Sequence, residues 1–343
     1  MPTITVDGQS LAIDGKRLWL VSGTVCYHRM PSALWGARIS AAKQAGLNCI
    51  ETPVVWSLHE PRPGVFKFDG DLDIAAFVRL VGAAKMHCIL RVGPFVGDGI
   101  DLGGMPAWLL KDCGGLVGKL RSGAAEFLQP VSRYFAALCD RISGLQASLS
   151  RKSAGPIVAV QNEHRWLCGS AEQSAAYLGE TNRYLRENGI SVPILSANEL
   201  FASAEGEIET WTGTSHLHAN MRQLRSLKPD QPRLVMGLTT CERGAWGAEA
   251  SSARIDASRI STVERGRSLM RVMAEALAAG AQFNLSPFHG GTNFGFLGGR
   301  FGDADGSFST TSAAAGSPLG EAGERGETYP SVRRMCLFAS QFG

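Results

Sequence analysis

The sequence predicts an α/β fold, a (β/α)8 TIM barrel preceded by a short N-terminal β-hairpin. First, eight strand-like segments are interspersed with helix-like segments within 343 residues, and such barrels typically need about 250. Second, the apolar run at Pro156–Glu163 has the pattern of a strand that is buried on both faces, as in parallel sheets. Third, the first strand ends in Cys26–Arg29 without the glycine-rich phosphate turn that an open doubly wound sheet normally shows.

The elements follow one another in a regular order. Residues 3–20 alternate between polar and apolar around Asp7-Gly8 and Asp14-Gly15, which predicts a hairpin. The expected strands are Trp19–Cys26, Cys49–Trp56, Cys88–Phe95, Pro156–Glu163, Pro193–Asn198, Ile208–Gly213, Arg233–Thr239 and Gln282–His289. Apolar residues at helical spacing predict helices in Ser32–Ala45, Asp71–Met86, Ala125–Gln146, Ser170–Glu187, Met221–Ser226, Thr262–Ala279 and Tyr329–Phe342.

The composition indicates a folded domain rather than a disordered chain. Apolar residues make up 44% of the sequence and charged residues 19%, with a scattered net charge of +3. Because no basic run occurs, we expect no nucleic-acid partner, and no apolar stretch approaches the ~20 residues of a membrane span. The first residues lack the pattern of a signal peptide, which favours a cytoplasmic location. The sequence leaves the oligomeric state open.

The eight cysteines do not form a metal-binding pattern. No two of them have the CxxC spacing of a zinc site, so we expect no metal and no cofactor. The longest expected loop is Gly290–Thr328, and loops of that length in compact domains are functional or disordered. No linker or internal repeat divides the chain, so we expect a single domain over residues 1–343.

Glu163 lies where the fourth expected strand ends. In parallel barrels the carboxyl ends of the strands carry the chemistry, which favours a functional role for this carboxylate. A carboxylate is costly to bury without a partner. Two alternatives therefore stay open, a side chain that points into a functional site and one that forms a structural salt bridge.

Several segments together resemble glycoside hydrolase family 35, the family of many β-galactosidases. The matching segments are SGTVCY at Ser22–Tyr27, ETPVVWSLHEP at Glu51–Pro61, GGMPAWLL at Gly103–Leu110 and FHGGTNFG at Phe288–Gly295. The resemblance implies a TIM barrel that acts on a β-linked, galactoside-like carbohydrate. Members of the family usually carry β-rich domains after the barrel. Because the sequence stops at Gly343, we expect these domains to be absent here, a truncated chain being the alternative.

The resemblance also implies a pair of catalytic glutamates. A retaining glycosidase needs two carboxyl groups about 5–5.5 Å apart, one as acid/base and one as nucleophile. Asn162-Glu163 matches the first half, so Glu163 is the acid/base candidate and Asn162 a candidate for binding a sugar hydroxyl. When the seventh strand is anchored on Trp246, the nucleophile position falls on Gly237, which has no side chain. Glu242 is the nearest replacement in sequence.

Other departures from the family lie in the same region. Gly97–Ile100, which includes Asp98, replaces a segment with a sugar-binding glutamate, and Ala315 replaces a tyrosine that supports the nucleophile. We expect a glycoside hydrolase with an atypical or missing nucleophile. If Asp98, Asp101 or Glu242 lies about 6.5–9.5 Å from Glu163, an inverting mechanism becomes available. The alternative is a non-hydrolytic carbohydrate-binding protein that keeps the barrel.

The candidate site therefore contains two kinds of residues. The candidate catalytic residues are Glu163 and Glu242. The candidate substrate-binding residues are Tyr27, Trp56, Asp98, Asn162, Trp166, Trp246 and His289. For the aromatic candidates, packing in the core is the alternative to stacking on a sugar. For His289 the alternative is a role in the tight backbone turn that its glycine neighbours predict.

Overall fold

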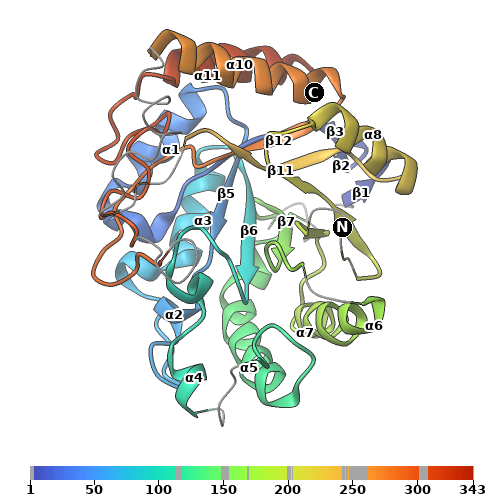
Figure 1. Cartoon of the computed structure of the whole chain (residues 1–343), viewed down its shortest axis with the longest axis vertical. Coiled ribbons are helices and arrows are strands. Elements are labelled where there is room, and N and C mark those ends of the chain that lie inside the picture. The colour runs from blue at the N-terminus through green and yellow to red at the C-terminus, as the bar shows by residue number, and fades with distance from the viewer. Residues whose placement is uncertain are drawn as a thin grey trace.

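A ring of parallel strands lies at the centre of the molecule, and helices surround it (Figure 1). The computed structural model describes residues 4–112, 118–147, 154–167, 170–198, 202, 204–241, 244, 246, 262–300 and 308–342. The strands of the ring are β4 (Val21–Thr24), β5 (Cys49–Pro53), β6 (His87–Gly93), β7 (Ile157–Asn162), β8 (Ile194–Ser196), β9 (Glu207–Glu209), β10 (Trp211–Thr212), β11 (Leu234–Thr239) and β12 (Gln282–Ser286). Each expected strand is present.

The ring closes because β9 and β10 are two halves of one interrupted strand. The strand order is β10-β11-β12-β4-β5-β6-β7-β8-β9, and every neighbouring pair is parallel. Only Thr210 separates β9 from β10, and its N–H donates to Ser196 O at 2.8 Å, which continues the pairing with β8. The predicted (β/α)8 barrel is therefore confirmed.

Most of the helices overlap the stretches where the sequence predicts them, although the helix at Leu217–Leu227 extends beyond the predicted Met221–Ser226 at both ends. They are α1 (Trp35–Gln44), α2 (Trp56–His59), α3 (Ile74–Ala83), α4 (Trp108–Asp112), α5 (Ala125–Ile142), α6 (Ala171–Ser174), α7 (Glu180–Glu187), α8 (Leu217–Leu227), α10 (Thr262–Ala278) and α11 (Tyr329–Ala339). Of these, α2 and α4 are short helices in loops where no helix was expected. Asp73 caps α3 by accepting a hydrogen bond from Ala76 N at 2.8 Å. No helix within the described ranges is long and apolar enough to cross a membrane.

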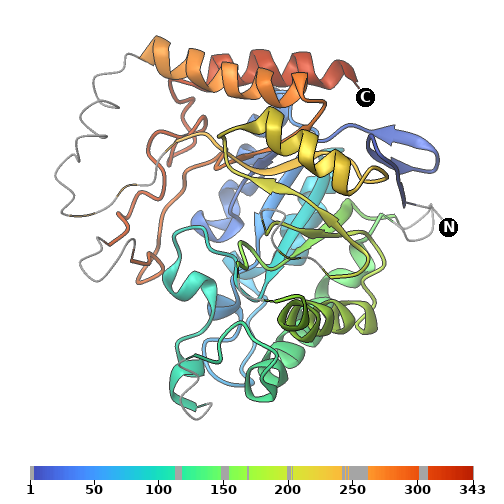
Figure 2. The same cartoon turned by 45° about the vertical axis from the view of Figure 1, so that its right-hand side comes forward.

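The N-terminal hairpin covers the amino-terminal end of the barrel. It consists of β1 (Ile4–Val6), β2 (Leu11–Ile13) and a third antiparallel strand, β3 (Lys16–Leu18). Leu11 and Leu18 belong to one buried cluster with residues of the barrel strands, so the hairpin seals this end of the ring. In Figures 1 and 2 it lies beside α8. The opposite end, where the strands finish, stays accessible.

Candidate functional site

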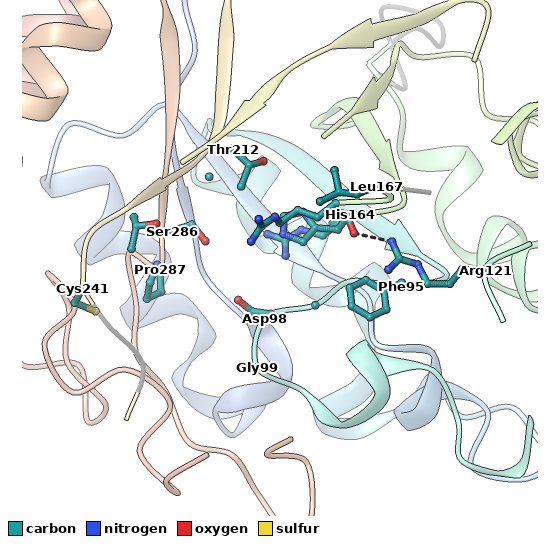
Figure 3. A pocket seen from close by; sticks show the side chains of 15 residues that line it. Phe95, Asp98, Gly99, Arg121, His164, Leu167, Thr212, Cys241, Ser286 and Pro287 are labelled. Atoms are coloured by element: carbon teal, nitrogen blue, oxygen red, sulfur yellow. Dashed lines mark hydrogen bonds between the residues drawn. The ribbon is translucent and has the colours of Figure 1, made fainter. Parts of the chain in front are cut away.

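A cavity of about 430 Å³ lies at the carboxyl ends of the barrel strands (Figure 3). This volume falls within the range of small-molecule sites, roughly 300–1,000 Å³. The described residues that line it are Arg91, Phe95, Gly97, Asp98, Gly99, Arg121, His164, Arg165, Leu167, Thr212, Gly237, Thr239, Cys241, Ser286 and Pro287. They come from β6, β10, β11 and β12 and from the segments that follow β6, β7, β11 and β12.

Gly237 lies on β11 in the wall of this pocket, at the position where the resemblance places a nucleophile. A Cβ atom added to Gly237 would lie 2.6 Å from Thr212 Cγ2, far closer than van der Waals contact. Thr212 therefore occupies the space that a side chain at position 237 would need. The neighbouring lining residues Thr239 and Ser286, which pair across β11 and β12, add hydroxyl groups and no carboxylate.

Asp98 is the one acidic residue among the described residues that line the pocket. Its carboxylate forms an ion pair with Arg29, with 2.5 Å between Nη1 and Oδ2, and Arg29 Nη2 donates to Asp98 O at 2.7 Å. The side chains of both residues are almost fully buried. Backbone and side chain of Asp98 are thus both held by one arginine behind the lining.

Arg91 has a carboxylate partner, as expected for a buried arginine. Its Nε lies 3.0 Å from Glu51 Oε1, and its Nη1 donates to Val96 O at 2.8 Å. Thr24 Oγ1 donates to the other oxygen of Glu51 at 2.5 Å. Burial raises the pKa of the Glu51 carboxyl, and the Arg91 guanidinium opposes that rise.

Glu163 follows β7 directly, but its side chain is 0% exposed and does not line the pocket. Arg121 Nη2 donates to Glu163 Oε2 at 2.7 Å, and the Tyr177 hydroxyl donates to Oε1. The N–H of His164 also donates to Oε2, at 3.1 Å. Of the two alternatives for Glu163, the structure therefore contains the salt bridge.

Arg121 is placed between Glu163 and the pocket by three contacts. Its guanidinium carbon lies 3.9 Å from the centroid of the Phe95 ring, and Nη2 donates to His164 O at 2.9 Å (Figure 3). Trp166 Nε1 donates to Arg121 O at 2.9 Å. These contacts fix the segment before α5 against the end of β7.

His164 brings an imidazole to the pocket. Gln161 Nε2 lies 3.2 Å from His164 Nδ1 and can only donate, so Nδ1 accepts and the ring proton is on Nε2. Burial, and then the positive charge of Arg91, hold the pKa of His164 well below its usual value. The imidazole is therefore neutral near pH 7 and presents an N–H donor.

Most of the site residues expected from the sequence lie outside the lining, and their assignment stays a prediction. Asp98 lines the pocket, whereas Glu242 lies outside the described residues. Trp246 is 63% exposed. The fully or almost fully buried ones are Tyr27, Trp56, Asn162, Glu163, Trp166 and His289.

Three of these buried residues have at least one polar side-chain atom paired within the protein, although Asn162 Oδ1 makes no hydrogen bond among the described residues. The Tyr27 hydroxyl contacts His59 Nε2, and Trp56 Nε1 donates to Glu60 Oε2 at 2.7 Å. Asn162 Nδ2 donates to Thr181 Oγ1 at 2.8 Å. The pocket is instead lined by Arg121, His164 and Thr212, among others, and the sequence analysis selected none of these three. Of the three, only His164 could have been found from the sequence, because it directly follows the Asn-Glu pair.

A closed parallel barrel with a polar pocket at the carboxyl ends of its strands is the architecture of (β/α)8 enzymes. Residues 10–338 match the model of the family described as Glycosyl hydrolases family 35. The chain belongs to this family.

Its relatives include β-galactosidases and related proteins. The chain is 32% identical over 332 residues to Beta-galactosidase-1-like protein 2 of Homo sapiens, a match that covers 95% of this chain and 49% of the relative. It is 31% identical over 306 residues to Beta-galactosidase of Xanthomonas manihotis, which covers 87% and 48%. The chain thus spans about half the length of these relatives.

Solved structures share the fold at low sequence identity. The exo-β-1,4-mannosidase Op5Man5 of Opitutaceae bacterium strain TAV5 is similar with a TM-score of 0.64 at 13% identity, covering 99% of this chain and 63% of the other. The β-galactosidase of the psychrophilic Marinomonas ef1 has a TM-score of 0.62 at 9% identity, covering 92% and 59%. At these identities the likeness concerns the barrel alone.

Proposed function

We propose that the chain binds a β-linked, galactoside-like carbohydrate in the mouth pocket and does not hydrolyse it through a glycosyl-enzyme intermediate. The observation that carries this proposal is the pair Gly237 and Thr212. A retaining mechanism needs a carboxylate that attacks the anomeric carbon. Glycine offers none, and the Thr212 methyl group fills the space that a side chain would require.

The pairing of the nearby carboxylates gives further support. Asp98 is bound to Arg29, and Glu163 is bound to Arg121. A carboxylate held by an arginine in a buried ion pair is stabilised as an anion and directed away from a ligand. These two carboxylates therefore favour binding over double displacement.

Hydrolysis with Glu163 as general acid/base is the second candidate. Membership of the family and the retained Asn162-Glu163 pair at the end of β7 favour it. This function requires Glu163 to separate from Arg121 and a second carboxylate to approach the sugar. Asp98 is one option, and Glu242 is another that lies outside the described residues.

Binding and hydrolysis of β-galactosides by the wild type and the Glu163→Gln variant separate the two candidates. We expect saturable binding of a β-galactoside by calorimetry, and equally low release of a chromogenic leaving group by both proteins. Arg183→Met, which changes an exposed arginine on α7, serves as the control. Hydrolysis by the wild type that falls about 100-fold or more in Glu163→Gln would favour the second candidate. The absence of any carbohydrate binding would refute both.

A further inference from the structure

We infer that the pocket takes up inorganic phosphate beside the sugar, and that phosphate attacks the anomeric carbon in place of a protein carboxylate. This inference rests on the proposed function, because the galactoside-like ligand must occupy the same pocket. It makes the chain a glycoside phosphorylase, which transfers the sugar to phosphate instead of to water.

The first observation is the wall around Gly237. This position has no side chain, Thr212 turns its methyl group towards it, and the lining residues Thr239 and Ser286 carry hydroxyl groups. A protein nucleophile would exclude a second anion from the same place by charge repulsion. Because Gly237 places no carboxylate at this point of the wall, an external oxyanion meets no repulsion from position 237.

The second observation is the charge of the lining. Among the described residues of the pocket wall, three are arginines and one, Asp98, is acidic. The arginines are Arg91, Arg121 and Arg165. The carboxylates of Glu51 and Glu163, which pair with two of them, are 0% exposed and lie behind the lining. Guanidinium groups are the side chains that bind phosphate oxygens best.

The third observation is a set of neutral donors. Thr212 Oγ1 is buried and makes no hydrogen bond within the part of the chain that the structure describes. A buried hydroxyl without a partner costs free energy, which a bound oxyanion would recover once rotation of the Thr212 side chain turns Oγ1 towards the pocket. His164, whose ring proton is on Nε2, lines the same pocket (Figure 3). The cavity thus offers cationic and neutral donors to one anion.

The reaction balances without any other co-reactant. An oxygen of dihydrogen phosphate forms a bond to the anomeric carbon, and the glycosidic carbon–oxygen bond breaks with its electron pair going to the leaving oxygen. The proton that phosphate loses from the attacking oxygen passes to the leaving oxygen. The products are a galactosyl phosphate and a free alcohol. Because a single displacement inverts the anomeric centre, a β-galactoside yields the α-phosphate.

Phosphate dependence in the wild-type full chain is the first test. A nitrophenyl β-galactoside is incubated with phosphate, or with chloride at the same ionic strength. We expect release of nitrophenol only with phosphate, and phosphorus NMR should show one α-galactosyl phosphate for each nitrophenol. Release that is equal in phosphate and chloride, or no release in either, overturns the inference.

Substitutions of lining residues test where the phosphate binds. Thr212→Val removes the hydroxyl and keeps the shape, and we expect the KM for phosphate to rise about tenfold or more while the KM for galactoside stays unchanged. Arg165→Met should raise the KM for phosphate in the same way. The matched controls are Thr5→Val and Arg183→Met, which change exposed side chains that do not line the pocket. Equal effects on both KM values would contradict a phosphate site at these residues.

The failure of this inference is distinguishable from the failure of the proposed function. If calorimetry shows galactoside binding but phosphate has no effect on cleavage, the phosphorylase reaction is refuted and the binding function stands. If phosphate binds but no galactoside does, both are refuted. If cleavage proceeds at the same rate in chloride, the chain is a hydrolase and both are refuted as well.

Discussion

Arg121 Nη2 lies 2.7 Å from Glu163 Oε2, so the glutamate at the end of β7 is bound to an arginine from the segment before α5. Glu163 is 0% exposed, and the Arg121 side chain is 19% exposed and forms part of the pocket wall. The arginine therefore separates the glutamate from any ligand in the pocket. The same arginine therefore stabilises the barrel mouth and determines whether Glu163 can reach a ligand.

The first prediction concerns this ion pair. Arg121→Met should lower the free energy of unfolding by about 2–4 kcal/mol, because it leaves a buried carboxylate without its cationic partner. Adding Glu163→Gln to that variant should recover part of the loss. Urea denaturation of the four proteins of the double-mutant cycle measures the coupling. Strictly additive effects would show that the two side chains do not interact.

The second prediction concerns the wall at Gly237. Gly237→Ala should destabilise the protein by about 1–3 kcal/mol, because the new methyl group overlaps Thr212 Cγ2. Thr212→Ser removes that Cγ2 atom and keeps the hydroxyl, so the double variant should regain most of the lost stability. Thermal or urea unfolding compares the three proteins. A Gly237→Ala variant as stable as the wild type would mean that Thr212 does not fill this space.

The third prediction concerns pH. Burial lowers the pKa of His59 from 6.5 to about 4 in the folded state. Its stabilising contribution is therefore fully present above pH 6.5 and is lost as the pH falls towards 4. For one such histidine the slope is at most about 1.4 kcal/mol per pH unit. His59→Gln should flatten the decline of unfolding free energy over this interval, and an unchanged slope would contradict the neutral, buried state of His59.

Much of the fold could be predicted from the sequence because its signals are local. Continuous apolar runs such as Ile157–Val160 mark strands that are buried on both faces, and every residue of that run is buried. The interruption of the sixth strand at Thr210 was not predicted, since it depends on the pairing with both neighbouring strands. A regular pattern of apolar residues specifies which segments form strands, but not how each strand pairs with its neighbours in the ring.

The candidate site was harder to predict, because it depends on side chains that meet from distant segments. The sequence placed Glu163 correctly at the end of a strand but left open whether it would face a ligand or a basic partner. Its partner, Arg121, lies 42 positions away in sequence. Tyr27 and Trp56 also end their segments near the mouth, yet their polar atoms find partners at His59 and Glu60.

The fourth prediction concerns His164 as a ligand contact. His164→Phe keeps a ring of similar shape and removes the N–H donor, so phosphate binding should weaken about fivefold to tenfold. Calorimetric titration with inorganic phosphate measures the change. The matched control is His218→Phe, which alters an exposed histidine on α8 and should leave the affinity unchanged. Equal affinities for the wild type and His164→Phe would exclude a contact between this imidazole and the phosphate.

The most direct test of the central claim asks whether the protein supplies a nucleophile. A deoxyfluoro-β-galactosyl fluoride traps the covalent intermediate of retaining β-galactosidases, because the fluorine substituent slows its breakdown more than its formation. The intact mass of this chain should stay unchanged after incubation, while a family member that keeps the strand-seven glutamate gains one fluorosugar. A mass increase of one fluorosugar on this chain, located on Asp98, Glu163, Glu242 or any other carboxylate, would contradict the account.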